Sequence, residues 1–209
     1  NMTTYSLPTI ACVLNAKRSM LKAPPILYVT DEERVPNPLP TIKKLHPGSG
    51  VIFRHYNTKS RLKLGLEVKD ACRHNSCLFL VAGDYSLAYR LNADGLHLPE
   101  YMVLNPSLKT RLWRQRPNKI LTASAHCHRS LIKCAALSVD AALLSPVFQT
   151  GSHLSKKNLG ISQFQKLADQ AKINIYALGG INSKNAMQLI NSPAIGIAGN
   201  SGVLHIQNY

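Results

Sequence analysis

The chain has 209 residues, with 25 Lys and Arg against 10 Asp and Glu, which gives a formal net charge of +15. An apolar share of 45% fits a folded globular domain and excludes a disordered chain. No run of about 18 apolar residues occurs, which excludes a membrane-spanning helix. The N-terminal residues do not have the pattern of a secretory signal. The surplus positive charge predicts an anionic partner: nucleic acid, acidic lipid or a small anion.

The cysteines and carboxylates of the chain exclude further classes of protein and of active site. The five cysteines are odd in number and form no Cys-x-x-Cys pair, which predicts reduced thiols in a cytoplasmic protein rather than disulfides or a zinc ribbon. The ten carboxylates are spread along the chain, which argues against a site built on a close acidic pair.

Short apolar runs recur along the chain and predict strands. Their hydrophobicity is continuous rather than alternating, which is typical of parallel strands that are buried on both faces. Eight such runs occur, at residues 26–30, 51–53, 78–82, 95–98, 119–124, 141–144, 173–178 and 194–198.

Segments with helical spacing alternate with these runs, at residues 60–73, 85–91, 128–137, 162–171 and 183–190, with Ser183 as the N-cap of the last. Eight strands alternating with helices predict an α/β fold, a single (β/α)₈ TIM barrel with short loops. A doubly wound open sheet is the alternative, but it usually has fewer strands, and no G-x-G-x-x-G follows the first strand.

The predicted barrel leaves a short segment ahead of its first strand. We assign residues 1–25 to an N-terminal arm and residues 26–209 to the barrel. The arm is either flexible or a plug for the bottom of the barrel.

Glycine-rich turns follow the last two predicted strands. Gly179 and Gly180 follow the seventh strand, and Gly199-Asn200-Ser201-Gly202 follows the eighth. Loops at these positions are the usual phosphate site of the barrel, because glycine lets backbone N–H groups approach an anion closely. The sequence therefore predicts a phosphate site here, with plain turn geometry as the alternative.

Three further side chains follow strand ends or lie in a loop between them. Arg54 either binds a second anionic group or pairs with Asp31 or Asp84. His126 is either a general acid or base near neutral pH or a structural imidazole. His153 lies in the loop after the sixth strand, which is either a lid over an anion or a solvated basic loop.

The order of motifs resembles the thiamine phosphate synthase and TenI (thiazole tautomerase) superfamily. The resemblance extends from about residue 26 to residue 203. It rests on five segments. Residues 27–31 read Leu-Tyr-Val-Thr-Asp, residues 93–98 read Ala-Asp-Gly-Leu-His-Leu, and residues 124–126 read Ser-Ala-His. Residues 139–150 run from Val-Asp-Ala to Ser-Pro-Val-Phe-Gln-Thr, and residues 177–181 read Ala-Leu-Gly-Gly-Ile.

The resemblance implies roles for particular residues. The synthase joins a pyrimidine pyrophosphate ester to a thiazole phosphate, and pyrophosphate leaves with the help of magnesium. Arg54 corresponds to the pyrophosphate-binding arginine, and Asp84 to a magnesium ligand. The residues implied around the thiazole phosphate are Thr150, Ser152, Gly180, Asn200 and Ser201.

The chain departs from the synthase pattern on the pyrophosphate side. Only Arg54 remains of the Gln-Leu-Arg-x-Lys motif, Met102 stands where the family has an aspartate, and His153 stands where it has a lysine. A leaving pyrophosphate needs cations in the transition state. These departures favour the TenI branch, which isomerises a thiazole carboxylate phosphate and whose catalytic histidine corresponds to His126.

Three functions follow from the resemblance. A TenI-like thiazole tautomerase, which needs no cofactor, is favoured. A thiamine phosphate synthase with Mg²⁺ is the first alternative, and a non-catalytic binder of thiamine phosphates is the second. The expected partner is a small phosphorylated thiazole or thiamine phosphate, without specific nucleic acid or membrane binding, and with a homodimer left open.

Overall fold

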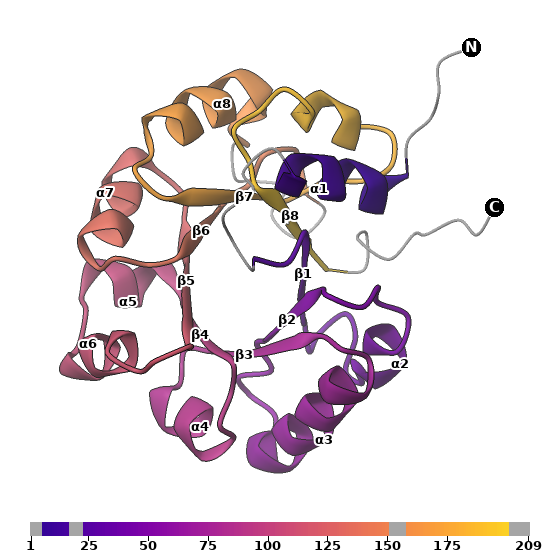
Figure 1. Ribbon diagram of the computed structural model, residues 1–209, viewed down its shortest axis with the longest axis vertical. Helices are drawn as coiled ribbons and strands as arrows, with labels where there is room; N and C mark the ends of the chain where they lie inside the picture. The colour runs from indigo at the N-terminus through magenta and orange to yellow at the C-terminus, as the bar shows by residue number, and fades with distance from the viewer. Residues whose placement is uncertain (1–5, 17–22, 151–157, 201–209) are drawn as a thin grey trace.

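The computed structural model describes residues 6–16, 23–150 and 158–200. Eight parallel strands pair in chain order, and β1 also pairs with β8, so the sheet closes into a barrel (Figure 1). Closure confirms the predicted (β/α)₈ barrel and excludes the open doubly wound sheet. The strands are β1 Ile26–Val29, β2 Gly50–Phe53, β3 Leu78–Ala82, β4 Gly95–Leu98, β5 Ile120–Ala125, β6 Ala141–Leu144, β7 Asn174–Leu178 and β8 Gly196–Gly199.

Each strand is buried on both of its faces, as its continuous hydrophobicity predicts. In β2, Ile52 belongs to a core cluster inside the barrel, whereas Val51 and Phe53 belong to the cluster between strands and helices. Successive side chains of a strand point to opposite faces. Every second residue therefore fills the barrel and the others support the helices.

Helices surround the barrel and connect most of the strands. They are α1 Leu7–Ala16, α2 Leu39–Ile42, α3 Arg61–His74, α4 Tyr85–Arg90, α5 Glu100–Leu104, α6 Leu108–Arg114, α7 His128–Ala136 and α8 Gly160–Gln170, with the 3₁₀-helix η1 Ala186–Leu189 before β8. Across the described ranges, none of these helices is long and apolar enough to cross a bilayer.

The segment before β8 differs from its prediction. We expected a helix over residues 183–190 with Ser183 as its cap, but the structure has the short η1 instead. Asn182 and Asn185 order the turn: Asn182 accepts from the Lys184 N–H at 2.9 Å, and Asn185 accepts from the Asn182 N–H at 2.9 Å. These asparagine contacts replace the serine cap.

The segment assigned to an N-terminal arm contains α1, which lies beside β8, β1 and η1 (Figure 1). Its buried side chains follow helical spacing and join the core layer between strands and helices: Leu7, Ile10, Ala11 and Leu14. Asn15 Nδ2 donates to the Ala23 and Ile195 carbonyls, at 3.0 Å each. The helix is therefore part of the outer layer of the barrel, beside the seam between β8 and β1.

Truncation of α1 side chains tests this packing. Leu14→Ala removes a fully buried side chain, so we expect it to lower the free energy of unfolding by about 2–5 kcal/mol. Val13→Ala, on the exposed side of the same helix, should change it by about 0.5 kcal/mol or less. Chemical denaturation monitored by circular dichroism measures both, and equal effects of the two changes would contradict the packing of α1.

Candidate active site

A pocket of about 1210 Å³ lies at the carboxyl ends of the strands. Seven of the eight strand ends contribute to its lining, and β3 contributes none. Predicted site residues that line it are Arg54, His126, Thr150, Gly180 and Asn200. Ser152, His153 and Ser201 lie outside the described residues.

The glycines after β7 allow two loops to meet. Gly179 and Gly180 have φ values of +102° and +67°. The Val147 N–H donates to the Leu178 carbonyl at 2.9 Å, and the Phe148 N–H donates to the Gly179 carbonyl at 3.0 Å. A Cβ atom on Gly180 would collide with the Gln149 carbonyl oxygen and lie 2.8 Å from backbone atoms of Phe148. Turn geometry and close approach thus both require glycine here.

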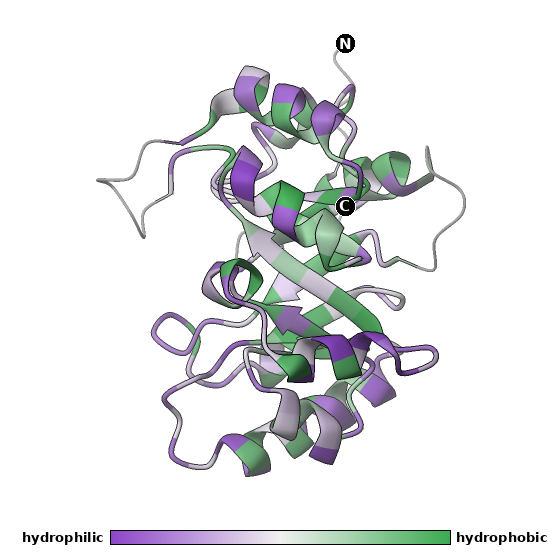
Figure 2. Cartoon of the chain, turned by 90° about the vertical axis from the view of Figure 1, so that its left-hand side faces the viewer, coloured by the Kyte–Doolittle hydropathy of each residue, from purple (hydrophilic) through white to green (hydrophobic). Residues whose placement is uncertain are grey.

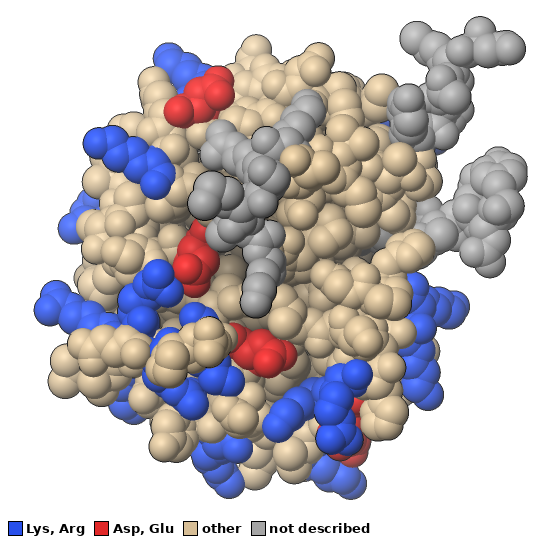
Figure 3. Space-filling view, viewed as in Figure 1, with Lys and Arg blue, Asp and Glu red and all other residues tan. Residues whose placement is uncertain are grey.

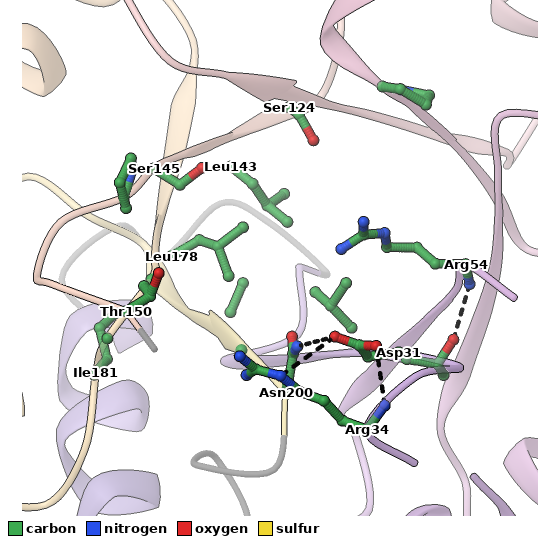
Figure 4. A pocket seen from close by; sticks show the side chains of 18 of the residues that line it. Asp31, Arg34, Arg54, Ser124, Leu143, Ser145, Thr150, Leu178, Ile181 and Asn200 are labelled. Atoms are coloured by element: carbon green, nitrogen blue, oxygen red, sulfur yellow. Dashed lines mark hydrogen bonds and ion pairs between the residues drawn. The ribbon is translucent and has the colours of Figure 1, made fainter. Parts of the chain in front are cut away.

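The same turn leaves backbone donors available to a ligand. The Gly180 carbonyl accepts from Asn185 Nδ2 at 2.8 Å, whereas the N–H groups of Gly180 and Ile181 donate to no group in the described ranges. Both residues line the pocket together with Thr150 (Figure 4). Free N–H groups beside a hydroxyl suit a bound phosphate.

Substitution of two glycines with similar φ separates the close approach from backbone strain. Gly180→Ala should lower the free energy of unfolding by about 3 kcal/mol or more, because backbone atoms must move. Gly48 has φ +83° and nothing within 4 Å of an added Cβ, so Gly48→Ala should cost only about 1 kcal/mol. Denaturant unfolding measures the difference, and equal losses would contradict the close approach of the two loops.

Asn200 lies at the seam between β8 and β1. Its Nδ2 donates to Asp31 Oδ2 at 3.0 Å, and Asp31 Oδ1 also accepts from the N–H groups of Glu33 and Arg34 at 3.1 and 3.3 Å. Figure 4 shows Asp31 between Asn200 and Arg34. The predicted phosphate ligand is therefore oriented by a carboxylate from the neighbouring strand end.

Arg54 extends from the end of β2 into the pocket (Figure 4). The two carboxylates considered as its partners pair elsewhere: Asp31 lies 3.8 Å from Arg34, and Asp84 lies 3.4 Å from Arg61. Within the described ranges Arg54 forms no ion pair, and its guanidinium lies 5.9 Å from the centre of the Tyr56 ring. Its charge is thus available to an anionic group of a ligand.

His126 is held at its main chain and at one ring nitrogen. Its N–H donates to Glu100 Oε1 at 2.9 Å and to Ser130 Oγ at 3.1 Å. Its Nδ1 lies 2.8 Å from the Ser145 carbonyl oxygen and donates to it, because a carbonyl oxygen only accepts. Nε2 of the neutral ring is then unprotonated and has no partner among the described residues, so it is able to exchange a proton with a ligand.

His97 lines the floor of the pocket, and sequence reasoning did not select it as a site residue. Its Nδ1 and Nε2 each lie 2.9 Å from a hydroxyl, of Thr122 and Ser124 respectively. Burial, with a smaller contribution from the positive charge of Arg54, lowers the pKa of His97 to about 3. His97 is therefore neutral at physiological pH and holds Ser124 at the pocket wall. A polar residue within an otherwise apolar predicted strand was the signal for it.

The low pKa of His97 makes stability depend on pH. The unfolded chain binds a proton on this residue below about pH 6.5 whereas the folded chain does not, so stability falls as the pH drops from about 6.5 towards 3. We expect His97→Gln to reduce the slope of unfolding free energy against pH by about 1.4 kcal/mol per unit between pH 6 and 4. Urea unfolding across this range measures the slope, with His128→Gln, an exposed position, as the control; unchanged slopes would contradict the neutral His97.

Asp84, implied as a magnesium ligand, does not line the pocket. Its Oδ1 accepts the Leu87 N–H at 2.9 Å, which caps α4, and its Oδ2 pairs with Arg61. Mg²⁺ prefers several oxygen ligands in octahedral arrangement. Glu100 accepts a hydrogen bond from the His126 N–H. Within the described ranges no three His, Cys, Asp or Glu side chains gather closely enough to hold a metal. These residues do not fit a magnesium site.

The matching family model and the curated relatives agree on one family. A family model described as thiamine monophosphate synthase matches residues 27–203. The "Putative thiamine-phosphate synthase 2" of Aquifex aeolicus is 31% identical over 184 residues, which cover 86% of this chain and 97% of the relative. The "Thiamine biosynthesis bifunctional protein ThiED" of Geobacter sulfurreducens is 29% identical over 94% of this chain, which spans only 40% of that protein.

A solved structure has the same fold. The thiamine phosphate pyrophosphorylase from Pyrococcus furiosus superposes with a TM-score of 0.71 at 22% identity, with 89% of each chain covered. At this identity the likeness supports the barrel and not the reaction.

Proposed function

The chain belongs to the thiamine monophosphate synthase family, and on this premise we propose that it is an enzyme of thiamine biosynthesis that binds a thiazole phosphate and transfers a proton on the thiazole ring. The proposed reaction is the tautomerisation of a thiazole carboxylate phosphate. The observation that carries it is the ring of His126, which lines the pocket with Nδ1 held by the Ser145 carbonyl and Nε2 unpartnered among the described residues.

The phosphate of the ligand is assigned to the loops after β6, β7 and β8. The N–H groups of Gly180 and Ile181, which donate to no described residue, and the hydroxyl of Thr150 offer hydrogen bonds without a full positive charge. Ser152, Asn200 and Ser201 complete the set that the family resemblance implies. An anchored phosphate restricts the ring to one region of the pocket, which supplies the orientation that proton transfer requires.

His126 then acts as both base and acid. Unprotonated Nε2 accepts a proton from one ring position of the thiazole, and the resulting imidazolium returns it to another, so that protons and charge balance over the cycle. The Ser145 carbonyl fixes the ring orientation throughout, because Nδ1 donates to it in both protonation states. Arg54 faces the same pocket and suits the carboxylate of the substrate or a second anion.

Substitution of two nearby histidines tests this role. His126→Ala should lower kcat for the tautomerisation of thiazole carboxylate phosphate by about 10²-fold or more, because the proton-transfer group is lost. His128→Ala is the matched control, since His128 is exposed at the start of α7 and does not line the pocket. Equal rates for wild type and His126→Ala would refute the assigned role.

A synthase reaction is the second candidate, favoured by the names of the relatives and by Arg54, whose charge is available to a pyrophosphate. It is tested separately by magnesium-dependent release of pyrophosphate from the pyrimidine pyrophosphate and thiazole phosphate substrates. Magnesium-dependent release of pyrophosphate would replace the tautomerase proposal with the synthase reaction. Binding of thiazole phosphate in calorimetry, without turnover in either assay, would instead identify a non-catalytic binder.

A further inference from the structure

Much of the surplus positive charge lies away from the pocket, on the outer helices. Residues 101–139 contain no Asp or Glu, although the chain has ten elsewhere. The Lys and Arg residues in that stretch are Lys109, Arg111, Arg114, Arg116, Lys119, Arg129 and Lys133. Figure 3 shows blue side chains over the side of the barrel where α5, α6 and α7 lie and also over α2 and α3, whereas tan surface dominates over α1.

Large apolar side chains are exposed among these cations. Leu108 and Leu112 of α6 are 71% and 43% exposed, and Ile132 of α7 is 55% exposed. The two leucines are four residues apart and therefore lie on the same side of α6. Figure 2 looks onto this side of the barrel, where apolar bands on the outer helices alternate with polar ones. Apolar side chains gathered on a charged surface are typical of an interaction site.

Four of the cations are available to a partner. Arg114 pairs with Asp140 at 3.3 Å, and the guanidinium of Arg116 lies 4.9 Å from the rings of both Tyr89 and Trp113. Within the described ranges, the remaining cations of the two helices have no carboxylate within ion-pair distance: Lys109, Arg111, Arg129 and Lys133. Together with Leu108, Leu112 and Ile132 they make up what we call the α6–α7 face, which extends over α6 and α7 on either side of α5 (Figure 1).

We propose that the α6–α7 face binds the surface of an anionic lipid bilayer. Lipid headgroups attract the four cations, and the headgroup–acyl boundary accepts the leucine and isoleucine side chains, so one partner satisfies both parts of the face. This departs from the expectation that the chain meets no membrane, but a surface contact needs no spanning helix.

Other occupants fit the face less well. A second copy with two-fold symmetry would bring two carboxylate-free sets of cations together, and their repulsion opposes the contact. A nucleic acid would neutralise the cations and stack on an exposed ring such as Tyr101 of α5, but it would leave the leucine and isoleucine side chains of the face in water. The pocket lies at the strand ends and α6 and α7 at the side of the barrel, so contact with a bilayer leaves the pocket free.

Co-sedimentation of the full chain with vesicles tests the proposal. We expect binding to vesicles of phosphatidylcholine mixed with phosphatidylglycerol and at least about tenfold weaker binding to phosphatidylcholine alone. Lys109→Glu with Arg111→Glu should weaken binding to the mixed vesicles at least about tenfold. Lys166→Glu with Lys172→Glu, on the exposed surface of the α8 region, changes net charge equally and should have little effect.

A second pair of variants tests the apolar part of the face. Leu108→Ser with Leu112→Ser should also weaken vesicle binding about tenfold or more, whereas Val13→Ser with Met187→Ser, exposed elsewhere, should not. Unchanged thermal unfolding of the variants confirms that they fold, and the tautomerase activity should be unaffected because none of these residues lines the pocket.

Three outcomes would overturn the proposal. If the α6 and α8 charge variants lost vesicle binding equally, the binding would depend on net charge and not on the α6–α7 face. Unchanged vesicle binding by Leu108→Ser with Leu112→Ser would show that the two leucines do not contact the bilayer. Binding of single-stranded RNA that competes with the vesicles and is insensitive to the leucine change would identify a nucleic-acid surface instead.

Discussion

Closure of the parallel sheet is the constraint on which the rest of the molecule depends. Backbone hydrogen bonds join β1 to β8, with Ile26 opposite Ile197 and Tyr28 opposite Gly199. Because every strand runs in the same direction, all carboxyl ends meet at one rim, and residues far apart in sequence line one pocket. Asp31 and Asn200, which are joined across the same seam, illustrate how the closing pair also shapes the site.

The pocket combines a neutral floor with charge at its wall. Burial keeps His97 uncharged, and Arg54 forms no ion pair within the described ranges, although Arg34 and carboxylates from the β1 and β4 ends also line the pocket. The backbone N–H groups after β7 provide polar contacts on the opposite side. A small ligand with one phosphate and a second anionic group is complementary to this arrangement.

Surface and pocket use charge in different ways. The pocket includes acids of the β1 and β4 ends, and these accept backbone hydrogen bonds: Asp31 orders the turn after β1, and Glu100 holds the main chain of His126. The α6–α7 face has cations without acids. The net charge of +15 therefore says little about the site, and seven of the cations lie in the carboxylate-free stretch 101–139.

Several local features were predictable, and others were not. The eight apolar runs predicted the strands, but α2, α5 and α6 have only four to seven residues and show too little helical periodicity to be found. His126 was found because it directly follows a strand, whereas His97 was missed because a strand of four residues does not show which of its faces points inward. Asp84 was assigned to a metal from the family pattern, and the structure uses it to cap α4.

The sequence by itself determined the order of strands, the barrel class, the glycine turn after β7 and the family, because these depend on hydrophobic runs and motifs that are local in the chain. Only the tertiary structure decided which polar groups are already used. The pairing of Asp31 with Asn200, of Asp84 with Arg61 and of His97 with Thr122 and Ser124 depends on distances between separate segments. Those distances are fixed by closure of the barrel and by the packing of its helices, and no spacing along the chain records them.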